Sequence, residues 1–213
     1  MRPAPHTAPG LTARRPVVTL AIDGMAYGRA AILAPLSLAL YPREVVALTG
    51  PSGAGKTTLL RIIAGLESRF EGTLTAPARR AMVFQEPTLL PWRSARKNLE
   101  IACGLSPAAA DDALETVGLP GLGARYPGQL SLGQQRRLSL ARAFASAPDL
   151  MLLDEPFVSL DGETAESIEA LFLSLTKTAD FPTLLVTHDP GEAARLASRT
   201  LTLSGAPARI EGQ

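Results

Sequence analysis

The fold of this chain is decided by the stretch Gly50-Pro51-Ser52-Gly53-Ala54-Gly55-Lys56-Thr57-Thr58. The apolar run 45–48 precedes it, and a stretch of helical character, 59–64, follows it. A strand, a glycine-rich loop and a helix in this order are the context of a phosphate-binding loop. The glycines let backbone N–H groups turn inward, and the helix N-terminus adds further unpaired N–H groups. We therefore predict that the whole stretch binds a nucleotide, that Lys56 reaches its β- and γ-phosphates, and that Thr57 ligates Mg²⁺. A glycine-rich turn without a ligand is the weaker interpretation.

Composition limits the possible classes of protein. The 213 residues suffice for one large domain or a domain with a sub-lobe, and the apolar fraction of 46% indicates a full core. A net charge of +1 gives no electrostatic case for nucleic acid as a partner. Cys103 is the only cysteine, which excludes an intrachain disulfide and suits a reducing compartment. The longest apolar run, 30–40, is interrupted by Pro35 and is too short to span a bilayer.

The order of apolar runs predicts an α/β fold. Strands are predicted at 17–22, 36–40, 45–49, 72–76, 81–84, 150–153, 183–187 and 200–203. Helices are predicted after the phosphate loop, from Ser106 to about Val117, from Ser131 to about Ala147, after the cap Asp161, and at 191–197. Strands that alternate with helices imply a mostly parallel sheet with helices on both faces. We expect a disordered tail at 1–16, a single domain at 17–205 with a helical lobe inserted at about 86–147, and a C-terminal tail at 206–213.

Two acids follow the buried strand 150–153. In parallel sheets ligands bind at the carboxyl ends of the strands, so Asp154 and Glu155 are expected beside the phosphate loop. We predict that Asp154 holds Mg²⁺ through water and that Glu155 polarises the attacking water as general base. Two solvated acids before a turn proline would be an equally good interpretation of this stretch alone. His188, directly after the strand 183–187, is a third polar site at the same edge.

A second motif, Leu130-Ser131-Leu132-Gly133-Gln134, begins a predicted helix. A capped helix N-terminus with a serine hydroxyl and a glycine N–H is an anion site. The motif resembles the Leu-Ser-Gly-Gly-Gln signature of ATP-binding cassette (ABC) ATPases in four of five positions. In that family the signature contacts the γ-phosphate of ATP held by a second copy, so the resemblance implies a head-to-tail dimer. Leu132 departs from the signature, because it replaces a flexible glycine and adds bulk at the dimer interface.

Further matches to the family follow in order over residues 17–203. Gln85 resembles a glutamine that binds Mg²⁺ or water, His188 a histidine that contacts the γ-phosphate, and Tyr27 an aromatic residue that stacks on adenine. Ser159-Leu160-Asp161 resembles a loop that lies along the dimer interface. The resemblance implies the ABC ATPase fold, ATP and Mg²⁺ as ligands, Mg²⁺ ligation by Thr57, Gln85 and Asp154, and catalytic roles for Glu155, His188 and Gln85. The stretch between Gly65 and Gln85 is short for the family, which predicts a trimmed antiparallel sub-sheet.

The segment 85–93 resembles bacterial import ATPases for nitrate, sulfonates and taurine. In that family it lines the groove that receives a permease helix, and an exposed Leu89-Leu90-Pro91-Trp92 suits such a partner. A tryptophan packed into the helical lobe is the alternative. The resemblance implies a subunit on the inner face of the cell membrane that acts with permease subunits and, indirectly, with a periplasmic or lipid-anchored solute-binding protein.

Other functions stay open at this point. Thiamine-precursor importers have similar ATPases, so the solute class is not fixed. A soluble ABC ATPase of an assembly or repair machine would carry the same motifs. A P-loop kinase of small molecules is disfavoured by the Ser131 motif and by His188.

Overall fold

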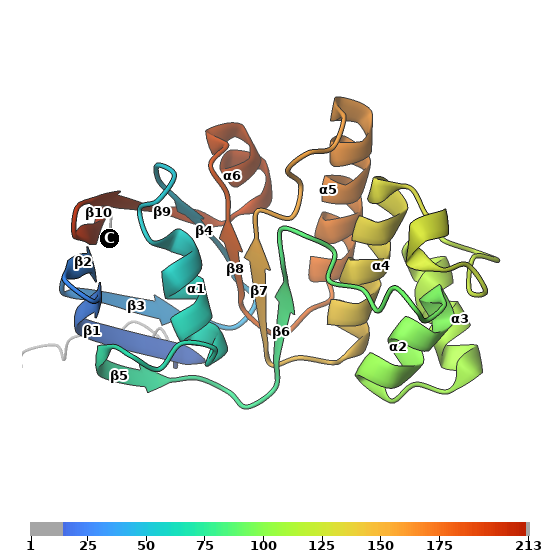
Figure 1. Cartoon of the computed structure of the whole chain (residues 1–213), viewed down its shortest axis with the longest axis horizontal. Helices are drawn as coiled ribbons and strands as arrows, with labels where there is room; N and C mark the ends of the chain where they lie inside the picture. The colour runs from blue at the N-terminus through green and yellow to red at the C-terminus, as the bar shows by residue number, and fades with distance from the viewer. Residues whose placement is uncertain (1–14, 212–213) are drawn as a thin grey trace, which may run out of the picture.

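The computed structural model describes residues 15–211, so the tail expected at 1–16 lies almost wholly outside the described residues. Ten strands form one sheet in the order β3-β1-β2-β10-β9-β4-β8-β7-β6, and β5 pairs with β1 (Figure 1). Helices cover both faces of this sheet, and a group of helices extends from one end of it (Figure 1). Over residues 15–211, none of the helices combines the length and the hydropathy that a membrane span needs.

The parallel half of the sheet carries the edge at which ligands are expected. Its strands are β4 (Val45–Thr49), β6 (Arg80–Val83), β7 (Leu150–Asp154), β8 (Thr183–Val186) and β9 (Arg199–Gly205). β7 and β8 are buried along their whole length, which explains why their sequences are continuous apolar runs. Because the strands are parallel, the residues that follow β4, β7 and β8 emerge at one edge.

The antiparallel half is built on β1 (Val18–Tyr27). It pairs with β2 (Ala30–Leu33), β3 (Leu36–Leu40) and β5 (Glu71–Thr75). β1 alternates buried and exposed residues over most of its length, as expected of a strand with one solvated face. The strand β10 (Ala208–Glu211) joins the two halves, because it pairs with β9 along its length and with β2 through Ala208 and Leu33.

The helices divide between the two sheet faces and a lobe. They are α1 (Lys56–Ala64), α2 (Ala95–Cys103), α3 (Pro107–Thr116), the 3₁₀ helix η1 (Pro127–Gln129), α4 (Leu132–Ala145), α5 (Gly162–Thr176) and α6 (Pro190–Leu196). α1 lies between the parallel and antiparallel halves (Figure 1). The lobe consists of α2 and α3 packed on α4, which also packs on α5 and β6.

Three apolar cores follow from this arrangement. Leu150 and Leu152 of β7 pack on the side of α1, whereas Met151 and Leu153 pack on the side of α4 and α5. This alternation is the period of two that a strand imposes on its side chains. The third core lies inside the helical lobe, where Leu99, Leu114 and Leu138 bring α2, α3 and α4 together. α4 therefore belongs to the lobe and to the sheet at once.

The structure confirms the α/β fold with a mostly parallel sheet, a short antiparallel part and an inserted helical lobe. The C-terminal tail expected at 206–213 is wrong for residues 208–211, because they form β10. The strand at 30–33 was not predicted either. Most side chains of both strands are exposed or half-buried, so an apolar pattern is missing and main-chain pairing defines them.

Candidate active site

The phosphate loop between β4 and α1 has the geometry that its glycines predict. Gly50, Gly53 and Gly55 have φ values of 142°, 78° and 92°, a region that favours glycine. A Cβ on Gly50 would lie 2.2 Å from the carbonyl oxygen of Leu203, so a side chain has no space there. α1 begins at Lys56 without a side-chain cap, which leaves the N–H groups of its first turn directed at the loop.

The Lys56 side chain folds back into this loop. It is 5% exposed, and its Nζ donates hydrogen bonds to the carbonyl oxygens of Gly50 at 2.8 Å and Pro51 at 3.0 Å. A cavity of about 720 Å³ adjoins the loop, lined by Gly50, Pro51, Ser52 and His188 among others. The ammonium group is thus held where phosphate oxygens can replace the two carbonyls.

Asp154 at the end of β7 meets the first turn of α1. Thr57 Oγ1 donates a hydrogen bond to Asp154 Oδ1 at 3.2 Å, and Asp154 is 8% exposed. Burial raises the pKa of the Asp154 carboxyl, while the hydrogen bond from Thr57 lowers it. A hydroxyl and a carboxylate beside a phosphate site are hard oxygen ligands of the kind that Mg²⁺ takes, so these two residues fit that ion.

Glu155 and His188 face each other next to Asp154. Glu155 Oε2 and His188 Nδ1 are 3.3 Å apart, and the side chains are 22% and 57% exposed. Glu155 has a φ of 46°, an uncommon conformation for a residue with a side chain, and its N–H donates to the carbonyl of Val186. The end of β8 thus fixes the backbone of Glu155 and, two residues on, presents His188. A carboxylate held this way can orient a water for attack.

Tyr27 and Gln85 are the remaining predicted residues of the site. Tyr27 ends β1, is 39% exposed and donates a hydrogen bond from Oη to Glu67 at 2.9 Å, which raises the pKa of Tyr27. The Arg69 guanidinium stands 5.3 Å from the Tyr27 ring centroid. Gln85 lies two residues after the end of β6 and is exposed.

The signature residues lie apart from this cluster. Ser131 is the N-cap of α4: its Oγ accepts the Gln134 N–H at 3.2 Å, and its own N–H donates to Gln134 Oε1 at 3.0 Å. Leu132 is 39% exposed. A Cβ on Gly133 would lie 2.6 Å from Thr164 Cγ2, so Gly133 lets α4 approach α5 closely. α4 is separated from α1 by β6, β7 and β8 (Figure 1).

The loop Ser159-Leu160-Asp161 leads from β7 into α5. Asp161 caps α5 by accepting the Thr164 N–H at 2.9 Å, and this hydrogen bond lowers the pKa of Asp161. Ser159 is exposed and has a φ of 65°. One chain therefore brings together the phosphate loop, Asp154, Glu155 and His188, and leaves Ser131 and Gly133 at a distance.

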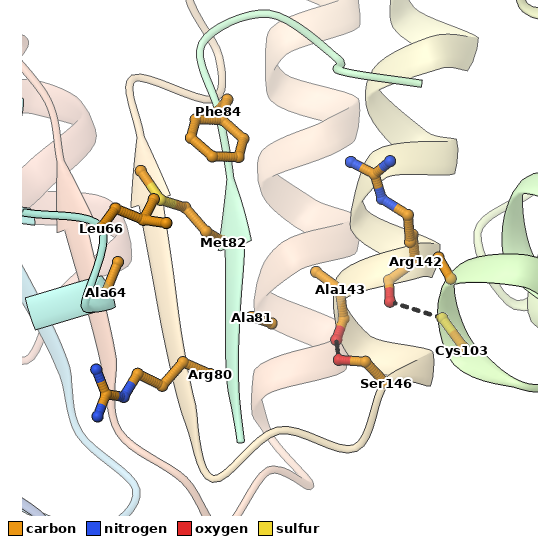
Figure 2. A pocket seen from close by; sticks show the side chains of 11 residues that line it. Ala64, Leu66, Arg80, Ala81, Met82, Phe84, Cys103, Arg142, Ala143 and Ser146 are labelled. Carbon is orange, nitrogen blue, oxygen red and sulfur yellow. Dashed lines mark hydrogen bonds between the residues drawn. The ribbon is translucent and has the colours of Figure 1, made fainter. Parts of the chain in front are cut away.

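A second surface feature joins the sheet and the lobe. A groove of about 370 Å³ is lined by Leu66, Met82 and Phe84 on the sheet side and by Cys103 and Arg142 on the lobe side (Figure 2). Cys103 Sγ donates a hydrogen bond to the Arg142 carbonyl, and burial raises the pKa of this thiol. Apolar side chains that are widely exposed are Leu66 at 61%, Trp92 at 68% and Ile101 at 55%. Trp92 is therefore not packed into the lobe.

Sequence reasoning missed Arg136, whose guanidinium contacts segments next to Gln85 and Ser159. An arginine on a helix normally indicates a solvated face, so no signal in the sequence marked it.

A phosphate-binding loop after β4, an acidic pair at the end of β7, two strands away in the sheet, and a facing histidine after β8 define a P-loop nucleotide hydrolase. Comparison with known proteins gives the family. The ABC transporter family model matches residues 33–158, and the chain belongs to this family. It is an ATPase, which binds and hydrolyses ATP.

Individual relatives agree with this assignment. The chain is similar to the aliphatic sulfonates import ATP-binding protein SsuB of Granulibacter bethesdensis, with 44% identity over 88% of this chain and 80% of the relative. SsuB 2 of Burkholderia lata is 38% identical and aligns with 100% of this chain and 82% of its own length. Among solved structures, the ATP-binding cassette MJ0796, in a dimeric post-hydrolysis state with ADP and Pi, gives a TM-score of 0.79. It is 28% identical, over 92% of this chain and 97% of that one.

Proposed function

We propose that two copies of this chain hydrolyse ATP to drive a membrane permease that imports an aliphatic sulfonate or a similar small solute. The observation that carries the catalytic part is the joint position of Lys56, the Thr57–Asp154 contact and the Glu155–His188 pair at one edge of the sheet. The solute class rests on the similarity to the SsuB proteins, which are import ATP-binding proteins for aliphatic sulfonates. This similarity favours import over an assembly or repair machine.

Each group of site residues has a separate role in ATP hydrolysis. The phosphate loop 50–58 binds the phosphates, and Lys56 exchanges its two carbonyl partners for phosphate oxygens. Thr57, Asp154 and Gln85 would hold Mg²⁺, which neutralises phosphate charge when bound. Glu155 accepts a proton from the attacking water, and His188, which faces Glu155, contacts the γ-phosphate. Tyr27 offers its ring to adenine.

A second copy completes the site. The helix α4, which carries Ser131 and Gly133 at its start, lies on the far side of β6, β7 and β8 from α1 (Figure 1), so we expect the signature to contact ATP only in another chain. In a head-to-tail dimer each signature would face the partner's phosphate loop, with Ser159-Leu160-Asp161 along the interface. The similarity to MJ0796, whose structure is a dimer with ADP and Pi, supports this arrangement.

The groove of Figure 2 is the docking surface for a permease helix. Its apolar lining and the exposed Leu66, Trp92 and Ile101 suit a partner rather than water. We place the chain in the cytoplasm at the inner face of the membrane, as one ATPase domain from residue 17 through β10 with the lobe at about 86–147. A solute-binding protein would deliver the solute on the other side.

The test of the catalytic part is Glu155→Gln. The variant should bind MgATP like the wild type, lose most of its hydrolysis, and accumulate as a dimer with ATP, because the intact phosphate site closes but the water is not activated. Sedimentation velocity with and without ATP measures this. Wild-type turnover in the variant would remove Glu155 from the mechanism.

The solute is tested in cells. Deleting the gene for this chain should abolish uptake of labelled ethanesulfonate, and restoring the wild-type gene but not Glu155→Gln should return it. Unchanged uptake in the deletion strain would contradict the solute class while leaving the ATPase assignment in place.

A further inference from the structure

The segment that follows β6 is bound along its main chain by one face of α4. The side chains involved stand three residues apart on the helix and therefore share a face. They pair with carbonyl oxygens as follows: Arg136 with Phe84 at 3.1 Å, Ser139 with Pro87 at 3.0 Å, and Arg142 with Thr88 at 2.8 Å. The helix that carries the signature at its N-terminus thus holds the segment that carries Gln85 and Trp92.

Arg136 differs from Ser139 and Arg142 because it also contacts the loop between β7 and α5. Its Nη2 donates to the carbonyl of Val158 at 3.4 Å. Phe84 directly precedes Gln85, and Val158 directly precedes Ser159. One guanidinium therefore connects α4, the signature helix, to two backbone segments. One is where the glutamine loop begins, at Gln85, and the other is where the interface loop Ser159-Leu160-Asp161 begins.

The environment of Arg136 is unusual for a cation. The residue is 3% exposed, and over residues 15–211 it forms no ion pair within 4 Å of a carboxylate. Its Nε is one of two buried polar side-chain atoms without a hydrogen-bond partner in the described part of the chain. Burial lowers the pKa of Arg136, and the more distant Glu86 raises it. Removing such a charge from water is costly, so packing alone would favour an apolar residue here.

The adjacent Arg137 shows the contrast. It is half-buried, and its guanidinium donates to the Val117 carbonyl at 2.8 Å and to Ser167 Oγ at 2.7 Å. These contacts join α4 to the lobe and to α5, away from Gln85 and Ser159.

We propose that Arg136 is a positioning residue that holds the glutamine loop and the interface loop in place relative to the signature helix. A movement of any one of these three on ATP binding would then move the other two. The inference rests on the proposed function. It assigns to Arg136 an effect on turnover and on the movement of the segment after Gln85, and no direct contact with ATP.

The experiment uses the full chain and Arg136→Met, which keeps an extended side chain but removes both carbonyl contacts. Affinity for a fluorescent ATP analogue should stay within about twofold of wild type, while kcat should fall at least about tenfold, in line with the loss of charged hydrogen bonds. Trp92 is the only tryptophan in the chain, so its fluorescence reports on the segment after Gln85. The MgATP-dependent change of this fluorescence should be lost in Arg136→Met and partly kept in Arg136→Lys.

Arg137→Met is the matched control and should keep both kcat and the Trp92 response. If Arg136→Met behaves like Arg137→Met in both measurements, the proposal is overturned. If Arg136→Met does not fold, Arg136→Lys carries the test, and wild-type kcat and Trp92 response in that variant overturn the proposal equally. A wild-type protein that neither binds nor hydrolyses ATP would instead count against the proposed function itself.

Discussion

The ammonium group of Lys56 is the single charge held inside the phosphate loop. It donates hydrogen bonds to the carbonyl oxygens of Gly50 and Pro51. Lys56→Ala should leave the glycine backbone intact but lower the affinity for MgATP about a hundredfold, the equivalent of roughly 2–3 kcal/mol for a charged hydrogen-bonding partner. Equilibrium binding of a fluorescent ATP analogue measures it. Lys97→Ala, on the exposed side of α2, is the control. Equal affinity in the two variants would contradict the role of Lys56.

Asp154 links the site to pH-dependent stability. Burial raises its pKa, so the folded protein binds the proton more tightly than the unfolded chain. The resulting stabilisation is fully present below the ordinary pKa of the carboxyl and is lost as the pH rises through the folded value. Without Mg²⁺, Asp154→Asn should therefore raise stability and Tm near neutral pH, with the gain vanishing in acid.

Asp161 serves as a control, because its pKa is shifted in the opposite direction from that of Asp154. The Thr164 N–H lowers the pKa of Asp161, so Asp161→Asn should lose stability at neutral pH and approach wild type in acid. Thermal melts of both variants between pH 4 and pH 8 test the pair, with the pH range spanning the carboxyl titrations. If both variants shift in the same direction, the burial of Asp154 is not what controls its proton.

Residues whose position depends on local order along the chain were predictable from the sequence. Lys56 and Thr57 follow the glycines by spacing, and Asp154 and Glu155 follow a strand that is apolar throughout. Arg136 was not predictable, because its burial depends on carbonyls 52 residues before it and 22 residues after it. A sequence does not show which helix side chains are removed from water by distant loops.

At the scale of elements, the contact between the start of α4 and α5 is set by one glycine. A Cβ on Gly133 would stand 2.6 Å from Thr164 Cγ2, closer than packed atoms allow. Gly133→Ala should destabilise the fold by roughly 1–3 kcal/mol through overpacking. Adding Thr164→Ser, which replaces the methyl group by hydrogen, should recover most of this loss, so that the two changes are strongly non-additive in chemical denaturation. Additive effects would contradict the close approach of α4 and α5.

Most helices with a capping pattern were predicted, although α2 with its cap Ser94 was not, and the short strands β2 and β10, defined by pairing, were missed. α4 begins where the Ser131 and Gln134 spacing places it, with both hydrogen bonds of a capping box formed. β2 and β10 are four residues each, and their side chains are mostly exposed or half-buried. β2 pairs with the preceding β1 and β10 with the preceding β9, and only the Ala208–Leu33 pair joins them across the chain. Main-chain pairing of this kind leaves little trace in local composition.

For the whole molecule, the decisive question is whether one chain contains a complete site. If each site takes its phosphate loop and Glu155 from one chain and its Ser131 from another, then Ser131→Arg and Glu155→Gln should each be inactive alone. Mixing them should restore hydrolysis, up to roughly a quarter of wild type, because about half of the dimers are mixed and each has one intact site of two. The measurement is ATPase activity of the mixture against each variant at the same total concentration.

Dilution gives an independent readout of the same arrangement. Wild-type specific activity should fall as the protein is diluted, because dimers dissociate by mass action. Specific activity that stays constant down to concentrations where light scattering finds only monomer, together with an inactive mixture, would show that one chain suffices.

The strand β10 has a consequence for the synthesis of the chain. β2 finds one of its neighbours in β10, about 175 residues later along the polypeptide. At about 5–20 residues per second, the ribosome makes β10 roughly 10–35 s after β2. During that interval β2 cannot pair with β10, although α1 already packs against the amino-terminal strands, and the edge of β2 is open to other chains. Main-chain pairing across the seam between the two halves of the sheet can therefore be completed only near the end of translation, and we expect chaperone protection of the nascent amino-terminal strands to raise the yield of this protein.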